Sequence, residues 1–174
     1  MFTVRHATDQ DFLKIYNLYK TVAAIPFGIA RSPEEISHTY IKNFMDRAAS
    51  AGIQLLIDNP DNTAEIVAEI HCYHPLPQIF KSVFSELTIA VHPNFQGQGL
   101  GKKIFTYLLQ WITVQRPDIL RIELFTQESN EKAIALYKKI GFVQEGRFEK
   151  RVPGKNNVME ADIPMAWFNP AFNV

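Results

Sequence analysis

The chain has 174 residues, 18 basic and 18 acidic side chains, and a single cysteine. This length suits one domain with a substantial hydrophobic core, and we expect residues 1–174 to form it. Zero formal charge disfavours nucleic acid and anionic membranes as partners, because no global field would attract the chain to them. The lone Cys72 excludes an internal disulfide and fits a reducing compartment, and a small buried side chain explains it better than a catalytic thiol does.

The N-terminus lacks a basic segment followed by an apolar core, and no apolar stretch approaches the roughly 20 residues of a membrane-spanning helix. We therefore expect a soluble, cytoplasmic protein with no membrane partner.

Hydrophobic periodicity predicts alternating strands and helices along the whole chain. A strand at about 2–6 precedes a helix at 9–22, and a capping box of Ser32, Pro33 and Glu35 predicts a second helix that ends near 49. The later elements are strands at 54–58, 65–73 and 84–92, a helix at 99–115, a strand at 120–126, a helix at 130–140, a strand near 142–147, and a last strand that ends near 168. This order predicts one mixed α/β domain, with about seven strands in a central sheet and about four helices.

A glycine-spaced turn at 91–102 reads Val-His-Pro-Asn-Phe-Gln-Gly-Gln-Gly-Leu-Gly-Lys, leaving an apolar strand and entering an amphipathic helix. Glycines at 97, 99 and 101 let backbone N–H groups face a ligand, and the helix adds its positive N-terminal end. A Walker A loop would need glycine in place of Gln96 and Ser or Thr in place of Lys103, and a dinucleotide loop would need GxGxxG spacing. The turn therefore predicts an anionic cofactor that belongs to neither class.

What remains is the pattern Gln-x-x-Gly-x-Gly, formed by Gln96, Gly99 and Gly101, which resembles the coenzyme A loop of the GNAT N-acetyltransferase superfamily. The segment Asn-Glu-Lys-Ala-Ile-Ala-Leu-Tyr-Lys-Lys-Ile-Gly-Phe at 130–142 is similar to a second motif of that family. The predicted order of elements resembles the GNAT fold over nearly the full chain. Two C-terminal runs, Gly-Arg-Phe-Glu-Lys-Arg and Met-Glu-Ala-Asp-Ile-Pro-Met-Ala, resemble its small-molecule and amino-acid branch, which includes phosphinothricin-type enzymes.

The resemblance implies acetyl-CoA as co-substrate. Amides of the glycine loop would hold the pyrophosphate, and the strand before the loop would pair with the pantetheine arm, where the sheet must splay at a bulge. An amide near Val91 would face the thioester oxygen, where such a donor is worth roughly 100-fold in rate. The predicted cofactor-binding residues are Ile89, Ala90, Val91, Gln96, Gly97, Gln98, Gly99, Leu100, Gly101, Lys102, Asn130 and Tyr137.

Tyr137 is the first catalytic candidate. It stands seven residues after Asn130, and two helical turns place both side chains on one face. A phenol with a pKa of about 10 can give a proton to a leaving thiolate of similar basicity. The alternatives are a tyrosine packed at a helix edge and an asparagine that caps the helix, and a cap is compatible with a cofactor contact.

Glu86 is the second catalytic candidate. It stands five residues before Val91 and resembles a strand glutamate proposed as general base in phosphinothricin-type enzymes. Some relatives carry a glutamate five residues before the motif asparagine, but here that position is Phe125, and Glu123 is offset by two. The base is therefore Glu86, Glu123 or water, and a solvent-facing role for Glu86 stays open.

The acceptor side is less defined in the sequence. The segment 22–30 is too apolar for an ordinary loop, so its Phe27 could line an acceptor pocket or tuck into the core. Arg31 could bind an acceptor carboxylate, although arginines in such positions are more commonly just exposed on the surface. Glu86 would face the acceptor amine. His71 and His74 lie three apart on a strand, so they face opposite sides, and no metal site is predicted.

The sequence thus favours an N-acetyltransferase that transfers acetyl directly, in a ternary complex, to the primary amine of a small molecule such as an amino acid. A protein Nα-acetyltransferase and a noncatalytic acyl-CoA sensor are the alternatives. The apolar C-terminal run Met-Ala-Trp-Phe-Asn-Pro-Ala-Phe could support a homodimer contact or could be core.

Overall fold

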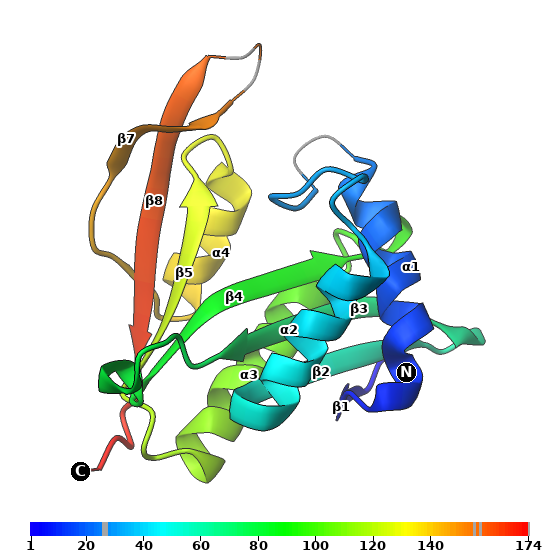
Figure 1. Ribbon diagram of the computed structural model, residues 1–174, viewed down its shortest axis with the longest axis horizontal. Helices are drawn as coiled ribbons and strands as arrows, with labels where there is room; N and C mark the ends of the chain where they lie inside the picture. Colours follow the sequence, from blue (N-terminus) through cyan, green and yellow to red (C-terminus); the bar gives the residue numbers. More distant parts are fainter. Residues whose placement is uncertain (26–27, 155, 157, 174) are drawn as a thin grey trace. The chain divides into compact units, whose positions relative to one another are not determined.

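The computed structural model describes residues 1–25, 28–154, 156 and 158–173 (Figure 1). In chain order its elements are β1 (Val4–His6), a 3-10 turn η1 (Asp9–Asp11), α1 (Phe12–Ala23), α2 (His38–Ala51), β2 (Gly52–Asn59), β3 (Asn62–Tyr73), η2 (Gln78–Phe80), β4 (Val83–Val91), η3 (Pro93–Phe95), α3 (Leu100–Gln115), β5 (Arg121–Gln127), α4 (Glu131–Lys139), β6 (Val143–Gln144), β7 (Phe148–Pro153) and β8 (Met159–Phe168). They group into two compact units, Met1–Tyr73 with Thr88–Leu108, and His74–Leu87 with Leu109–Val174. Strand β4 and helix α3 each have residues in both.

The first unit is built on the antiparallel strands β1, β2 and β3, with β4 next in the order. The Asn-Pro-Asp-Asn turn closes the predicted hairpin, since Asn59 pairs with Asn62. Helices α1 and α2 pack against β2 and β3 through apolar side chains at helical spacing. The buried core of these elements comprises Ile15, Leu18, Tyr19, Val22, Ala23, Ile36, Ile41, Phe44, Met45, Ala48, Leu56, Ile66, Tyr73 and Ala90.

The second unit has β5 at its centre. The first residues of β4 pair with β5 in parallel, β5 pairs with β8 in antiparallel fashion along its whole length, and β6 and β7 both pair with β8. The described residues thus form eight strands of a mixed sheet, in the order β1-β2-β3-β4-β5-β8-β6 with β7 beside β8. None of the described helices is both long and apolar enough to cross a membrane.

Two predicted boundaries are wrong. The second helix begins at His38, because Ser37 accepts the first free amide, from Tyr40, at 3.1 Å. The expected capping box forms only a turn, in which the Glu35 carboxylate accepts the Ser32 N–H at 2.7 Å. The strand expected near 142–147 is the two-residue β6, and a separate strand β7 follows it, so the sheet gains a strand.

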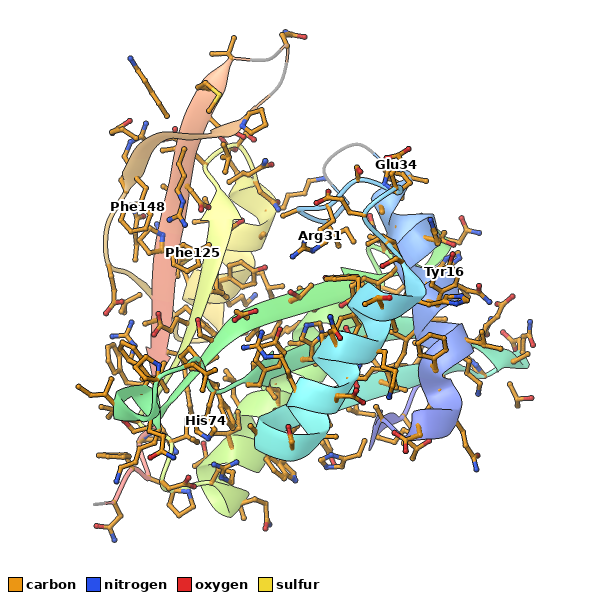
Figure 2. All side chains as sticks on the ribbon, viewed as in Figure 1. Tyr16, Arg31, Glu34, His74, Phe125 and Phe148 are labelled. Atoms are coloured by element: carbon orange, nitrogen blue, oxygen red, sulfur yellow. The ribbon has the colours of Figure 1, made fainter. Side chains whose placement is uncertain are left out.

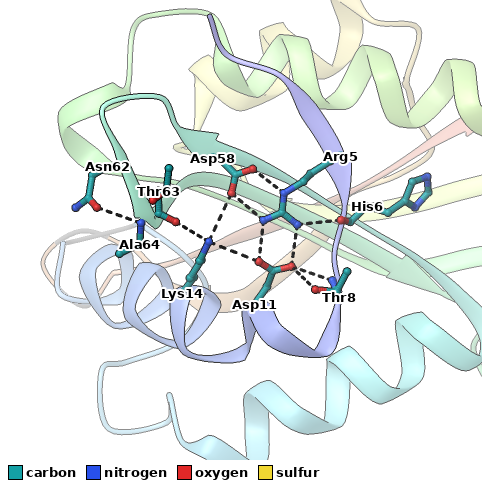
Figure 3. Close-up of polar contacts among 9 residues, drawn as sticks. All are labelled: Arg5, His6, Thr8, Asp11, Lys14, Asp58, Asn62, Thr63 and Ala64. Carbon is teal, nitrogen blue, oxygen red and sulfur yellow. Dashed lines mark hydrogen bonds and ion pairs between the residues drawn. The ribbon is translucent and has the colours of Figure 1, made fainter.

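An ion-pair cluster joins β1, η1 and the end of β2 (Figure 3). The Arg5 guanidinium donates to both oxygens of Asp11, at 2.7 and 2.8 Å, and to both oxygens of Asp58, at 2.6 and 2.7 Å. Thr8 donates its N–H and its hydroxyl to Asp11. Burial by itself would raise the pKa of Asp11, but these hydrogen bonds outweigh it and lower the pKa to about 2.

The cluster predicts an acid-sensitive contribution to stability. The pKa of Asp11 is lower in the folded protein than the ordinary 3.8, so its contribution is complete above about pH 4 and is lost as the pH falls toward about 2. We expect Asp11→Asn to lower the free energy of unfolding by about 2 kcal/mol at pH 7 and to remove this part of the acid loss. Urea unfolding at pH 7, 4 and 2.5 measures both effects, with exposed Asp9→Asn as the control. Equal pH dependence in Asp11→Asn and wild type would contradict the assignment.

Candidate active site

The glycine loop lies between η3 and α3 in the first unit. Gly97 and Gly99 adopt left-handed φ angles of 77° and 78°, which other residues rarely adopt, and a Cβ at either position would have no atom within 4 Å. The Gln96 side chain donates to the carbonyl of Val91 at 3.2 Å and so ties the loop to the end of β4. Each of the two glycines therefore leaves its backbone beside open space.

The loop fits the pyrophosphate-binding role predicted for it. Helix α3 begins at Leu100, and the first amides of a helix have no acceptor within the helix. Gly101 is half-buried and the Leu100 side chain is buried, so the helix start is anchored. The exposed predicted residues are Gln96, Gly97, Gln98, Gly99 and Lys102. Backbone amides and exposed polar side chains are what an anionic group requires.

The predicted pantetheine strand is the last part of β4, in the same unit as the loop. Ala90 is 1% exposed and belongs to the core covered by α1 and α2, whereas Ile89 and Val91 are half-buried. Because successive side chains of a strand alternate between its two faces, this pattern of burial indicates that Ile89 and Val91 point to the face opposite Ala90. After Val91, the His92 N–H donates to the Val67 carbonyl of β3 at 2.9 Å, which holds the strand up to the loop.

Glu86 lies at an irregular backbone position within the continuous strand β4, in the second unit. Its φ is 51°, in the left-handed region, and its side chain is exposed. The parallel register of β4 with β5 comprises two pairs, Val83 with Arg121 and Phe84 with Ile122, and ends two residues before Glu86. The bulge was expected at residues 89–91, whereas the left-handed backbone of this strand lies at Glu86, three residues before them.

Asn130 is the N-cap of α4, and Tyr137 lies within that helix. The Asn130 side chain accepts the Ala133 N–H at 3.3 Å, so the capping alternative is confirmed. Tyr137 is 8% exposed, with its ring centroid 5.9 Å from that of Phe142. Burial raises the pKa of Tyr137 to about 12. The phenol is therefore protonated throughout the neutral range.

A buried polar network lies under α1 and was not predicted. The Glu69 carboxylate accepts the Tyr19 hydroxyl at 2.6 Å and the Gln54 amide at 2.8 Å, and His71 Nδ1 lies 2.9 Å from it. The Phe44 ring stacks on His71, with centroids 4.1 Å apart. Glu69 and His71 stand two apart in the apolar second half of β3, a spacing that puts both on one face and could have revealed the pair. Every bonding partner is internal, so the network fixes β2, β3 and α1 together.

The acceptor-side predictions have mixed outcomes. Phe27 lies outside the described residues. Ile29 packs partly buried against the core of the first unit, which supports the core alternative for that side chain. Arg31 is exposed, lies 4.5 Å from the Tyr40 ring centroid and 3.4 Å from Glu35, and is thus held by its own neighbours (Figure 2). Among the described residues, no group of three or more His, Cys, Asp or Glu is arranged to hold a metal ion.

Comparisons with known proteins identify a family that matches most of the chain. Residues 12–142 match the model of the acetyltransferase (GNAT) family. An uncharacterized N-acetyltransferase, ycf52 of Pyropia yezoensis, is 35% identical over 57 residues, which is 33% of this chain and 30% of that protein.

Solved structures show the same fold. The ribosomal-protein-S18-alanine N-acetyltransferase of Escherichia coli aligns with a TM-score of 0.74 and 22% identity, over 97% of this chain and 94% of that one. The yncA structure from Salmonella typhimurium, which includes its cofactor acetyl-CoA, aligns with a TM-score of 0.79 and 16% identity, over 96% and 93%.

Proposed function

The chain belongs to the acetyltransferase (GNAT) family, and from this premise we propose that it transfers the acetyl group of acetyl-CoA to the primary amine of a small molecule such as an amino acid. The observation that carries the proposal is the pair of left-handed glycines, 97 and 99, beside open space at the start of α3. Residues 1–174 would act as one domain, since the family match spans residues of both units. The resemblance of the C-terminal runs to the amino-acid branch favours a small acceptor over a protein.

Cofactor binding would rest on three parts of the chain. The amides of Gly97 to Lys102 would hold the pyrophosphate, and the backbone of Ile89, Ala90 and Val91 would pair with the pantetheine arm. An N–H near Val91 would polarise the acyl oxygen. Acetyl-CoA itself would supply an activated acetyl carbon, and residues of the chain would position it and handle the protons. Asn130 would contact the cofactor from the start of α4 while its side chain caps that helix.

The transfer forms an N–C bond and breaks a C–S bond, so one proton must leave the amine, and the departing thiolate must be stabilised by a hydrogen bond until solvent protonates it. Glu86 is exposed on β4 and can take the amine proton directly or through water. The Tyr137 hydroxyl is protonated, so it cannot take the amine proton, but it can donate a hydrogen bond to the sulfur. Because its pKa is about 12, the phenol stabilises a developing thiolate chiefly as a hydrogen-bond donor and does not release its proton freely.

The direct test incubates the protein with acetyl-CoA and a panel of amino acids, polyamines and N-terminal peptides, and follows release of the CoA thiol. We expect release that depends on the added amino acid, because in direct transfer the CoA thiol leaves only when the acceptor amine attacks the acetyl carbon. Release with peptides alone would favour a protein Nα-acetyltransferase. Tight acetyl-CoA binding without release by any amine would indicate a sensor and would contradict the proposal.

Tyr137→Phe tests the donor. Removing the hydroxyl should lower kcat by about 100-fold, the lower end of the usual effect of a positioned acid. The dissociation constant of acetyl-CoA should stay within a few-fold, since the ring remains. Tyr107→Phe, on the exposed side of α3, is the matched control. Full turnover by Tyr137→Phe would remove the residue from the mechanism.

Glu86→Gln tests the base. The amide keeps the size of the side chain and a similar cost for the left-handed backbone but cannot accept the amine proton, so kcat/KM should fall by about 100-fold and its acid limb should change shape. Glu123→Gln on β5 serves as control. An unchanged pH profile in Glu86→Gln would assign the proton to water, and a change confined to Glu123→Gln would move the base to β5.

A further inference from the structure

Two half-exposed aromatic rings lie together on the sheet of the second unit. Phe125 on β5 is 46% exposed and Phe148 on β7 is 44% exposed, and their centroids are 6.0 Å apart with an interplanar angle of 25° (Figure 2). Ile122, Leu124 and Thr126 of β5 are buried, so Phe125 projects from the opposite face. Large rings left half in solvent on one face form a surface that an apolar group could cover.

Arg151 lies over both rings. Its guanidinium carbon is 5.0 Å from the centroid of Phe125 and 4.8 Å from that of Phe148. Its Nε lies 3.6 Å from the carboxylate of Asp162, and 49% of the side chain stays exposed. This ion pair engages one side of the guanidinium, and the donors on its two Nη atoms can bind a carboxylate in bidentate fashion. We call Phe125, Phe148 and Arg151 the aromatic–arginine cluster.

The backbone of β7 is irregular where it presents the cluster. Phe148 pairs with Asp162 and Val152 pairs with Glu160, so β7 uses four steps where β8 uses two. Lys150, within this bulge, has a φ of 51°. Bulges redirect side chains, and a non-glycine residue in the left-handed region stores strain of about 1 kcal/mol or more. The bulge thus brings two side chains of one edge strand, Phe148 and Arg151, to the same ring of β5.

The cluster and the predicted base Glu86 both belong to the second unit, on strands β4, β5 and β7. The parallel pairing of β4 and β5 ends at Phe84 and Ile122. Glu86 is two residues beyond this point on β4, and Phe125 is three residues beyond it on β5. A ligand held by the cluster would therefore be bound where β4 and β5 cease to pair.

We propose that the aromatic–arginine cluster is an acceptor subsite, which binds the carboxylate and the apolar, preferentially aromatic, side chain of a free amino acid whose α-amine is acetylated. This inference rests on the proposed acetyltransferase function and names its substrate class. Arg151 would pair with the carboxylate, and the rings of Phe125 and Phe148 would cover the side chain. The proposal adds Arg151 to Arg31 as a candidate for the carboxylate, since each guanidinium lies over an aromatic ring beside one carboxylate and is about half exposed.

The test compares L-phenylalanine with L-phenylalaninamide, which keeps the ring and the amine but lacks the carboxylate. We expect the wild-type protein to prefer the amino acid and Arg151→Gln to lower the ratio of the two kcat/KM values by about tenfold or more, mainly through KM. Arg147→Gln is the matched control, because Arg147 pairs with Glu128 and Glu149 and not with the rings. Phe148→Leu should lower the preference for phenylalanine over alanine several-fold, and thermal unfolding checks that each variant folds.

Each outcome decides the question. If wild type acetylates amines and Arg151→Gln leaves the ratio unchanged, the subsite is wrong and the proposed function stands. If Phe148→Leu alters the sedimentation coefficient and not the preference, the cluster is a contact between copies. If no amine is acetylated, the proposed function fails, and binding of 3-phenylpropanoate, followed by NMR, decides separately. If 3-phenylpropanoate binds the wild-type protein and Arg151→Gln abolishes this binding, a site for aromatic carboxylates is supported. If the compound does not bind, or binds equally well to Arg151→Gln, the proposed subsite is wrong.

Discussion

The left-handed backbone of strand β4 at Glu86 is the constraint on which the arrangement of the candidate site depends. A parallel pair gains a hydrogen bond for every residue that stays in register, yet β4 and β5 share only two pairs. At Glu86 the backbone enters the left-handed region, which costs a non-glycine residue roughly 1–2 kcal/mol. Such strain persists only where the surroundings hold it, and here the two ends of β4 belong to two different compact units.

The irregular position at Glu86 divides β4 into two parts with different surroundings. Before it, Val83 and Phe84 are buried and anchor β4 to β5. After it, Ala90 packs in the core under α1 and α2, while Val91 leads through His92 to the glycine loop. The strand therefore carries the exposed Glu86 carboxylate in the second unit and, five residues later in the first unit, Val91, from which the chain enters the glycine loop.

How much could be predicted from the sequence depended on whether the controlling interactions are local. The glycine loop and the Asn130 cap were predictable because both follow from residues within one turn of each other. The start of α2 was not, because Ser32 and Ser37 are both competent caps, and burial of Ile36 and the bond from Tyr40 decide between them. Strand β7 was missed because its bulge breaks the alternation that marks a strand. The Glu69–His71 network and the aromatic–arginine cluster depend on partners from distant strands or helices, which local spacing does not reveal.

The two proton-handling candidates differ in environment in the way that their roles require. Tyr137 is buried, and a pKa of about 12 keeps its hydrogen in place until a strong base develops beside it. Glu86 is exposed, so water can carry a proton away from it between turnovers. Had the burial been exchanged, a buried carboxylate would hold its proton and a solvated phenol would hydrogen-bond to water in place of the thiolate. The asymmetry therefore favours donation on α4 and proton acceptance on β4, and it makes the reverse assignment physically poor.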